Sequence, residues 1–312
     1  MTNETSLAPI ALFVYNRPWH TKQTIEALQK NELADQSELF IFSDGAKDDI
    51  DRDLVKEVRA YIKTINGFKK IVILEKEKNG GLATSIIDGV TSIINRYGKI
   101  IVLEDDLVTG PYFLSFMNDG LEMYEDTLKV SQIVGYSYFE KYIQKYNLQD
   151  TLFIKGGDCL GWGTWKNRWI HFDPSSSSLL EQIKNNNQVK EFNVNNSYGF
   201  YEMLEKESRG KVGSWAIRWY ASVFLKNLYT LYPSKSLVLH IGNDKWGTNY
   251  NLNSSFDPLD VPIYENRIHL NKIDIFQKEN SRKAYSEFLL QYKIPFFKKI
   301  IIKFKTFYKS MS

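Results

Sequence analysis

The first half of this 312-residue chain alternates short apolar runs with helical patterns, and this alternation constrains the fold more than any other feature. The apolar runs, which predict strands, are residues 9–15, 39–42, 70–74 and 99–103. Helices are predicted between them at residues 21–29, 53–65 and 82–96. Because consecutive parallel strands are joined by crossovers, usually helices, the pattern predicts an α/β fold with a mainly parallel central sheet flanked by helices.

Polar residues follow each of the four predicted strands. The motifs are Asn16-Arg17-Pro18, Ser43-Asp44-Gly45, Asn79-Gly80-Gly81 and the carboxylate triplet Glu104-Asp105-Asp106. The carboxyl ends of parallel strands share one edge of a sheet, and ligands bind at that edge. The first three motifs are also compatible with ordinary turns, or with a helix capped by Asn79. Together, however, the four motifs predict one polar site.

The carboxylate triplet is the strongest sign of chemistry, because the surrounding run 101–108 is otherwise uncharged. A buried strand excludes isolated ions, so these side chains are expected where the strand ends, facing a cleft. Their mutual repulsion favours a divalent cation, and hard oxygen ligands select Mg²⁺ or Mn²⁺. The alternative is a solvated acidic turn.

The second half of the chain predicts a smaller, more irregular lobe. A helix at 111–124 and a strand at 130–135 precede it, and the serine run 175–178 and the stretch 195–197 predict loops. Trp162, Trp165 and Trp169 recur at helical spacing, which predicts that they lie on one face of a helix. We expect this face to pack in the core or at a lobe interface, and the alternative is a surface on which sugars stack. We divide the chain into 1–150, 151–271 and a tail, 272–312.

The tail is strongly basic. Its last segment contains no acid and six of the 40 basic side chains, leaving 34 basic against 37 acidic elsewhere. This distribution argues against a general nucleic-acid-binding surface. Residues 294–309 predict an amphipathic helix that lies on an anionic membrane surface or packs on the protein body. The six lysines are Lys293, Lys298, Lys299, Lys303, Lys305 and Lys309.

No apolar stretch follows a basic N-terminal region, and no run of about 18 apolar residues occurs, so neither export nor membrane spanning is expected. The expected location is cytoplasmic, with peripheral contact at the inner membrane through the tail. Cys159 is the single cysteine, which excludes an internal disulfide and a cysteine-rich zinc site.

The ordered motifs resemble those of bacterial polysaccharide glycosyltransferases with the GT-A (Rossmann-like) fold that are related to N-acetylglucosaminyltransferase I. The resemblance covers residues 9–250. It rests on PIALFVYNRP, IFSDG, NGGLATS and IVLEDDLV, and later on GDCLGWGTWKNRW, SWAIRWYAS and YPSKSLVLHIGNDKWGTN. It implies a nucleotide-sugar-binding half at 1–150 and an acceptor-binding half of the same domain at 151–271.

The resemblance also implies roles for the triplet. Asp106 would bind the metal that bridges the donor diphosphate, Asp105 would contact the ribose or the metal's water shell, and Glu104 would contact the donor sugar. Arg17 and Asp44 would hold the nucleotide. From the residue types themselves, Arg17 suits a phosphate and Asp44 suits a base imide or a ribose hydroxyl.

Further residues complete the predicted site. Asn79, Gly80 and Arg218 are expected to bind the nucleotide sugar, although Arg218 could instead pair with an acid. His240, at the end of the last predicted strand, is a metal ligand or phosphate donor, with a structural role as the alternative.

The base that would activate the acceptor is harder to assign. In N-acetylglucosaminyltransferase I an Asp precedes the tryptophan of the second-lobe helix, whereas this chain has Gly213-Ser214-Trp215. Asp158 is the leading substitute, with a turn or cap role as its alternative, and Glu202 and Asp244 stand behind it.

The predicted function is metal-dependent transfer of a hexosyl or N-acetylhexosaminyl group from a UDP-linked sugar to a glycan or lipid-linked glycan acceptor. The family implies an inverting enzyme of bacterial surface polysaccharide synthesis, such as O-antigen or capsule. One alternative is a sugar-phosphate nucleotidyltransferase, but the segment 15–19 lacks the Gly-rich basic loop expected of that class. The other is a non-catalytic carbohydrate-binding protein, which the missing carboxylate at Gly213 favours.

Overall fold

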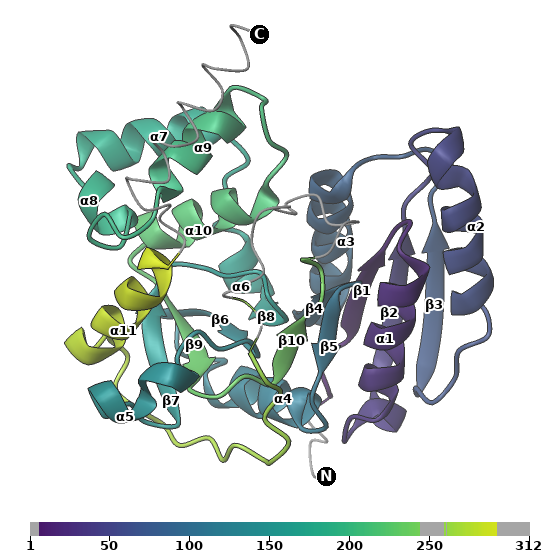
Figure 1. Ribbon diagram of the computed structural model, residues 1–312, viewed down its shortest axis with the longest axis horizontal. Helices are drawn as coiled ribbons and strands as arrows, with labels where there is room; N and C mark the ends of the chain where they lie inside the picture. Colours follow the sequence, from purple (N-terminus) through teal and green to yellow (C-terminus); the bar gives the residue numbers. More distant parts are fainter. Residues whose placement is uncertain (1–5, 244–258, 260, 292–312) are drawn as a thin grey trace, which may run out of the picture.

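The computed structural model describes residues 6–243, 259 and 261–291. Its centre is an eight-stranded sheet with strand order β3-β2-β1-β4-β8-β6-β9-β7 (Figure 1). These strands are β1 (Ile10–Val14), β2 (Glu38–Ser43), β3 (Lys70–Glu75), β4 (Lys99–Glu104), β6 (Val130–Val134), β7 (Thr151–Lys155), β8 (Trp162–Trp165) and β9 (Tyr229–Pro233). A separate antiparallel pair contains β5 (Leu107–Thr109) and β10 (Val238–His240).

Helices cover the sheet, and some of them form a small lobe beside it. They are α1 (Pro18–Gln29), α2 (Asp49–Ile62), α3 (Leu82–Tyr97), α4 (Phe113–Met123), α5 (Ile143–Tyr146), α6 (Lys166–Trp169), α7 (Ser176–Asn185), α8 (Val189–Phe192), α9 (Phe200–Ser208), α10 (Trp215–Leu225) and α11 (Glu279–Leu290). Two short 3₁₀ turns are η1 (Ala34–Gln36) and η2 (Glu140–Tyr142).

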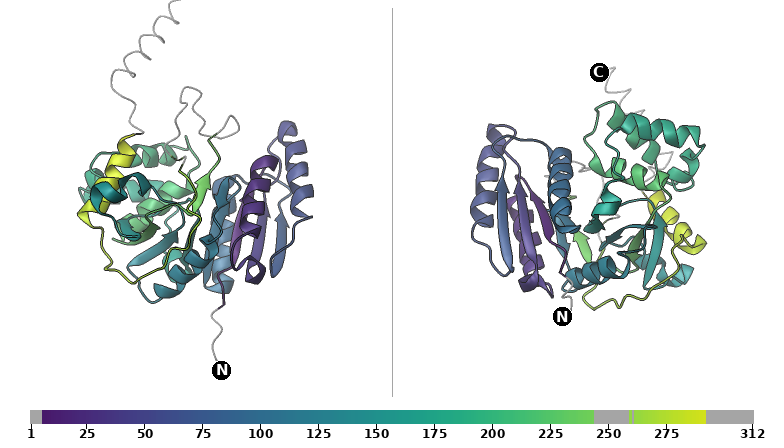
Figure 2. Two further views of the ribbon diagram at one scale, coloured as in Figure 1. Left: turned by 60° about the horizontal axis from the view of Figure 1, so that its bottom comes forward. Right: turned by 180° about the vertical axis from the view of Figure 1, so that it is seen from behind.

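The first four strands are mutually parallel, as predicted. β1 pairs with β2 on one side and with β4 on the other, and β2 pairs with β3. The crossover helices α1 and α2 contact each other, whereas α3 packs on β1 and β4 from the opposite face (Figure 2). The chain therefore reverses its direction of travel across the sheet between β1 and β4, which makes their carboxyl ends a topological switch point.

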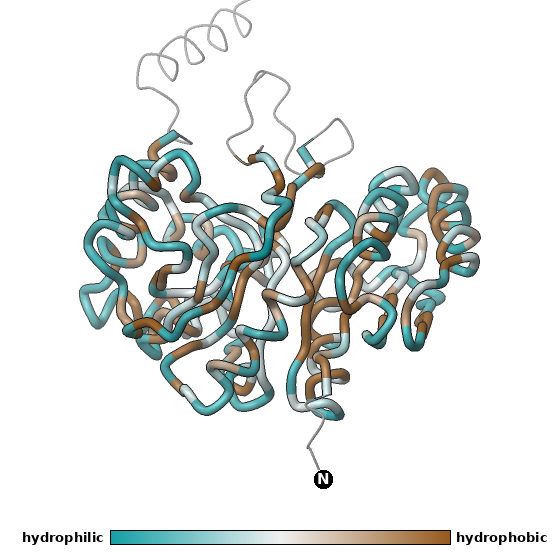
Figure 3. The backbone as a smooth tube through the Cα atoms, turned by 90° about the horizontal axis from the view of Figure 1, so that it is seen from below, coloured by the Kyte–Doolittle hydropathy of each residue, from teal (hydrophilic) through white to brown (hydrophobic). Residues whose placement is uncertain are grey.

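Burial on both faces explains the apolar composition of these strands. All five residues of β1 are buried, and in β4 the residues from Ile100 to Leu103 are buried. The hydropathy colouring of the backbone in Figure 3 shows brown segments mainly in the centre and teal segments mainly at the periphery. The predicted α/β architecture, a mostly parallel sheet flanked by helices, is confirmed.

The second half of the chain extends the same sheet. β8 lies antiparallel to β4, with Gly163 opposite Ile101, and β6, β9 and β7 follow outward. Helices α7 to α10 form a lobe with its own apolar cluster. That cluster contains Leu179, Ile183, Phe192, Leu204, Ile217, Tyr220, Ala221 and Phe224.

Two local predictions for this half were wrong. Trp162 and Trp165 belong to β8, and only Trp169 is helical, in α6, because pairing with β4 overrides the helical spacing. The serine run is not a loop: Ser175 caps α7 by accepting a hydrogen bond from the Ser178 amide, and the remaining serines begin the helix.

The last described helix lies against the outer strand of the sheet. The helix α11 packs on β7 and α5. Among the described residues, every helix is too short or too polar to span a bilayer. The predicted amphipathic helix at 294–309 lies outside the described residues, as does Asp244.

Candidate active site

Arg17 joins the ends of the two strands that flank the switch point. It follows β1, and its Nη1 lies 2.8 Å from Asp106 Oδ2 and 3.4 Å from Asp105 Oδ1, after β4. Arg17 and both carboxylates are largely buried, with side-chain exposures of 10–16%. The switch point therefore brings together three residues that the sequence predicts for one site.

The triplet has an uneven charge distribution. Burial and repulsion by its two neighbours raise the pKa of Glu104 to about 8, and burial and Asp106 raise the pKa of Asp105 to about 7. Burial also disfavours the charge of Asp106, but His240 and Arg17 outweigh it and lower the pKa of Asp106 to about 2. Asp106 is thus the carboxylate that stays ionised, which suits a cation ligand.

His240 reaches the triplet through the pairing of β10 with β5, in which His240 is opposite Leu107. Its Nε2 lies 3.6 Å from Asp106 Oδ2, and the Ile241 amide donates to the Asp106 carbonyl oxygen at 2.9 Å. His240 Nδ1 is buried and, among the described residues, has no hydrogen-bond partner. The predicted position of His240 at the end of a strand is confirmed.

Gly242 closes this side of the site. A Cβ atom on Gly242 would clash with the Asp106 carboxylate and would lie 2.8 Å from His240 Nε2. Gly242 is not among the site residues predicted from the sequence. The only signal for it is its place two residues after the strand that ends in His240.

The donor set fits a divalent ion that the substrate helps to bind. Across residues 6–243, 259 and 261–291, no group of three or more His, Cys, Asp or Glu side chains could hold a metal ion on its own. Mg²⁺ sites of the nucleotide-dependent type use one or two protein carboxylates, and phosphate and water oxygens complete the shell. Asp106 and Asp105, which Arg17 Nη1 contacts together, supply one or two such carboxylates, and His240 lies beside Asp106.

Asp44 binds the protein's own backbone. Its Oδ2 accepts the Gly80 and Gly81 amides at 3.1 and 2.9 Å, and its Oδ1 accepts the Gly45 and Gly80 amides at 3.0 Å each. The negative charge lies at the start of α3, where the helix dipole favours it. Asn79 does not cap α3, since Gly81 is the N-cap residue; its side chain donates to the Gly45 carbonyl oxygen at 2.8 Å.

Asp51 holds the segment before Arg17. Its two oxygens accept hydrogen bonds from Tyr15 Oη and Asn16 Nδ2, each at 2.6 Å. Burial and this hydrogen bond raise the pKa of Tyr15 to about 12, so the phenol remains a donor. Asp51 therefore fixes the turn that presents Arg17.

Asp158 is held by four hydrogen bonds. Its Oδ1 accepts the Cys159 and Leu160 amides at 2.6 and 3.1 Å, and its Oδ2 accepts the hydroxyls of Tyr138 and Tyr232 at 2.7 and 2.9 Å. Burial nevertheless raises its pKa above the ordinary value. This geometry fits the turn-fixing alternative, and a base role would require a tyrosine to release Oδ2.

Arg218 is engaged within the helical lobe. Its Nε lies 3.5 Å from Glu207 Oε1, and the other Glu207 oxygen accepts the Ser214 amide at 2.7 Å. The structure therefore pairs Arg218 with an acid, the alternative noted from the sequence. Glu202 lies in the first turn of α9, and within the described residues no hydrogen bond or ion pair links it to the triplet.

The tryptophans form part of the core. Trp162 stacks on Trp215 with ring centroids 5.3 Å apart, and Trp169 and Trp219 pack beside them. All four are buried, which supports the core-stripe prediction over the sugar-stacking one. Trp215 also provides a hydrogen bond that favours the charged form of Glu104, so the stripe reaches the acidic site.

Comparison with known proteins gives partial structural similarities. No protein-family model matches the chain, and no curated protein matches it. The S. aureus TarS structure has a TM-score of 0.31 and 13% identity over 40% of this chain and 21% of its own. A mannosyltransferase, PcManGT from Pyrobaculum calidifontis, in complex with GDP-Man and Mn²⁺, gives 0.38 and 10% over 57% and 47%.

The galactosyltransferase LgtC, in complex with donor and acceptor sugar analogues, has a TM-score of 0.33 and 13% identity over 56% of this chain and 65% of its own. The chain spans less than two thirds of each of these three proteins. With TM-scores below 0.5, these similarities carry no functional assignment.

Proposed function

We propose that this protein is a metal-dependent glycosyltransferase that uses a nucleoside diphosphate sugar, in the first instance a UDP-linked hexose or N-acetylhexosamine. The observation that carries the proposal is the pairing of Arg17 with Asp105 and Asp106 at the switch point of the sheet. A nucleotide diphosphate needs both positive charge and hard-metal ligands, and the two meet at this position.

Asp106 and His240 would hold a Mn²⁺ or Mg²⁺ ion. When bound, the ion would act as a Lewis acid toward the diphosphate on which charge accumulates as the sugar leaves. Arg17 would exchange part of its pairing with Asp105 for a phosphate oxygen. Asp105 would then face the ribose, and Glu104 the donor sugar.

The nucleotide would extend from the diphosphate toward the ends of β2 and β3. Asp44 fixes the loop of Asn79 and Gly80 there, so these residues would shape the wall of the nucleotide subsite. We assign Asp44 this role rather than a direct contact, because backbone amides already occupy both of its oxygens.

On the acceptor side, we keep Asp158 as the first base to test, with inversion of configuration as the expected outcome. The acceptor would be a glycan or lipid-linked glycan of a bacterial surface polysaccharide. Such an acceptor would make contact with the inner membrane useful.

A thermal-shift screen of UDP- and GDP-linked sugars with Mn²⁺ tests the proposal. A ligand that binds only the folded state raises the melting temperature, and at 100 times its Kd it adds about 2.7 kcal/mol of stability. Metal-dependent release of nucleoside diphosphate should follow when an acceptor is supplied. Release of pyrophosphate would indicate a nucleotidyltransferase instead, and donor binding without transfer or hydrolysis would indicate a carbohydrate-binding protein.

A further inference from the structure

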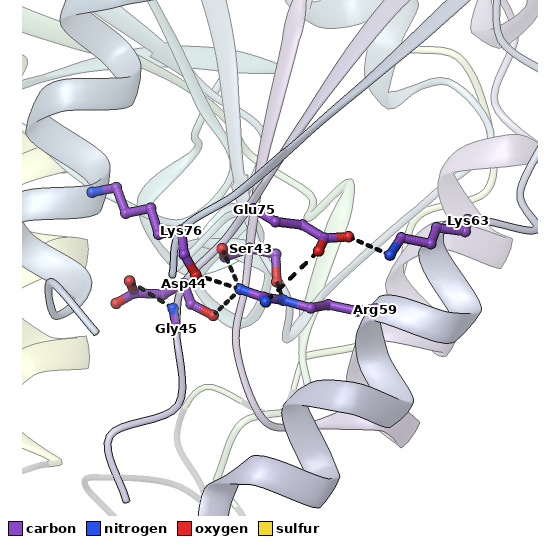
Figure 4. A network of polar contacts seen from close by, with 7 residues as sticks. All are labelled: Ser43, Asp44, Gly45, Arg59, Lys63, Glu75 and Lys76. Carbon is purple, nitrogen blue, oxygen red and sulfur yellow. Dashed lines mark hydrogen bonds and ion pairs between the residues drawn. The ribbon is translucent and has the colours of Figure 1, made fainter. Parts of the chain in front are cut away.

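Arg59, near the end of α2, binds the ends of two strands at once. Its Nη2 donates to the carbonyl oxygens of Asp44 and Lys76, at 3.1 and 2.6 Å, and to that of Ser43 at 3.4 Å (Figure 4). Its Nε donates to Ser43 Oγ at 3.1 Å. One guanidinium group therefore donates to the carbonyl oxygens at the end of β2 and to the carbonyl oxygen that follows β3.

A pair of acidic and basic side chains supports Arg59 from the side. Glu75 Oε2 lies 3.7 Å from Arg59 Nη1, and Glu75 Oε1 lies 2.8 Å from Lys63 Nζ (Figure 4). The Arg59 side chain is 22% exposed, compared with 59% for Lys63. Arg59 thus inserts between α2 and the strand ends, whereas Lys63 remains at the surface.

The contacts of Arg59 lead to the predicted nucleotide wall in two steps. Arg59 fixes the Asp44 backbone, and the Asp44 carboxylate fixes the amides of Gly80 and Gly81. Asn79 adds a hydrogen bond back to the Gly45 carbonyl oxygen. The position of the loop before α3 therefore depends on the position of the β2 end, which Arg59 sets.

We propose that Arg59 is a positioning residue for the nucleotide subsite: it holds the β2 and β3 ends in the register at which Asp44 shapes the loop of Asn79 and Gly80. The inference rests on the proposed function. Arginine suits this role because its planar group offers several donors in a fixed geometry, whereas lysine offers a single flexible ammonium group. In the described part of the chain, the polar contacts of Arg59 go to Ser43, Asp44, Lys76 and Glu75 and not to the acidic triplet, so the reacting end of the site should not depend on it.

The test compares R59K and R59A with the matched control R52A. Arg52 lies on the same helix but is 72% exposed and pairs with Asp49, at 2.6 Å. Affinities for UDP and for GDP are measured by calorimetry with Mn²⁺, and KM and kcat are measured with the donor that the wild-type protein accepts. Circular dichroism identifies the temperature range in which each variant is folded.

R59K is expected to fold, to bind the preferred nucleoside diphosphate at least fivefold more weakly, and to keep kcat within twofold. R59A should show a larger loss of affinity if it folds, and R52A should match the wild type. A folded R59K with wild-type affinity, or one that loses kcat at unchanged KM, overturns the inference. An R59K that does not fold likewise overturns it, because Arg59 would then be a determinant of folding.

Wild-type protein that binds neither UDP nor GDP overturns the proposed function together with this inference. Wild-type protein that binds one of them, alongside an R59K variant that binds it equally well, overturns the inference alone.

Discussion

Arg17 Nη1 lies 2.8 Å from Asp106 Oδ2. This ion pair joins the residue that precedes α1 to the last of the three carboxylates at the end of β4. Both side chains are 16% exposed, so solvent screens their attraction only in part. The ion pair stabilises the negative charge of Asp106, which the neighbouring carboxylates destabilise by repulsion. Under the proposed function, a cation would bind beside this pair.

Removal of Arg17 should make the site depend more on a divalent cation. R17A removes the guanidinium group that pairs with Asp105 and Asp106, and breaking a buried pair in this way costs about 3–5 kcal/mol at full burial. We expect a lower melting temperature in EDTA and a larger Mn²⁺-induced rise than in the wild-type protein. Differential scanning fluorimetry with and without Mn²⁺ measures both, with K22A, on the exposed part of α1, as the control. An equal rise in the two proteins would contradict the cation site.

Asp106 should be essential for turnover. D106N removes the carboxylate that stays ionised, and loss of one preorganised electrostatic group lowers kcat by about 100-fold or more. The measurement is nucleoside diphosphate release at saturating donor and Mn²⁺, with the fold checked by circular dichroism. D49N is the matched control because Asp49 is 86% exposed on α2. Full turnover by D106N would remove Asp106 from the metal assignment.

The space beside Asp106 and His240 should tolerate only glycine at position 242. The methyl group of G242A would clash with the Asp106 carboxylate, so metal-dependent activity should fall at least tenfold while the sheet remains folded. G213A is the matched control, since a Cβ there meets nothing within 4 Å. The readouts are activity and the Mn²⁺ concentration at half-maximal rate. Equal activity of the two variants would show that the close contact of residue 242 with Asp106 and His240 does not matter for activity.

The raised pKa of Asp158 predicts a pH dependence of stability. The folded state retains the Asp158 proton more strongly than the unfolded chain, whose value is near 3.8. The contribution to stability is therefore fully present below that value and is lost as pH rises through the higher folded pKa. D158N should flatten this decline. Urea denaturation from pH 3.5 to 8 measures the slope, and an unchanged slope in D158N would locate the dependence elsewhere.

The contacts of Arg218 predict a role in stability. R218A removes a partly buried ion pair with Glu207 at the start of α10, and the loss should be about 1–3 kcal/mol. R209A should cost less, because Arg209 is 63% exposed and lies 3.9 Å from Glu205. Urea denaturation compares the two variants. A higher KM for the donor in R218A, without a loss of stability, would instead support the nucleotide-sugar-binding role predicted from the sequence.

The N-terminal strands were predictable because their signals are local. β1 and β4 are buried on both faces and therefore consist of uninterrupted apolar residues, which mark them without knowledge of their neighbours. α2 begins at Asp49, four residues before the predicted start, because Asp48 caps it by accepting the Asp51 amide. That cap lies in a polar stretch where apolar periodicity gives no signal.

Trp162 and Trp165 show where local patterns fail. Their spacing fits a helix, but backbone pairing with β4 and β6 makes the segment a strand. The carboxylate of Asp44 is a similar case. Its residue type suggested a nucleotide ligand, whereas the folded chain places three backbone amides around it.

The sequence by itself determined the first four strands and the three helices between them, the polar ends of these parallel strands and the concentration of carboxylates after β4. These properties follow from periodicity and from the exclusion of charge from a buried strand. Only the tertiary structure decided which residues meet at the triplet. Pairing of β10 with β5 brings His240 and Gly242 to Asp106, and α2 brings Arg59 to the ends of β2 and β3. Such contacts join segments far apart in the chain, and residue spacing within one segment carries no information about them.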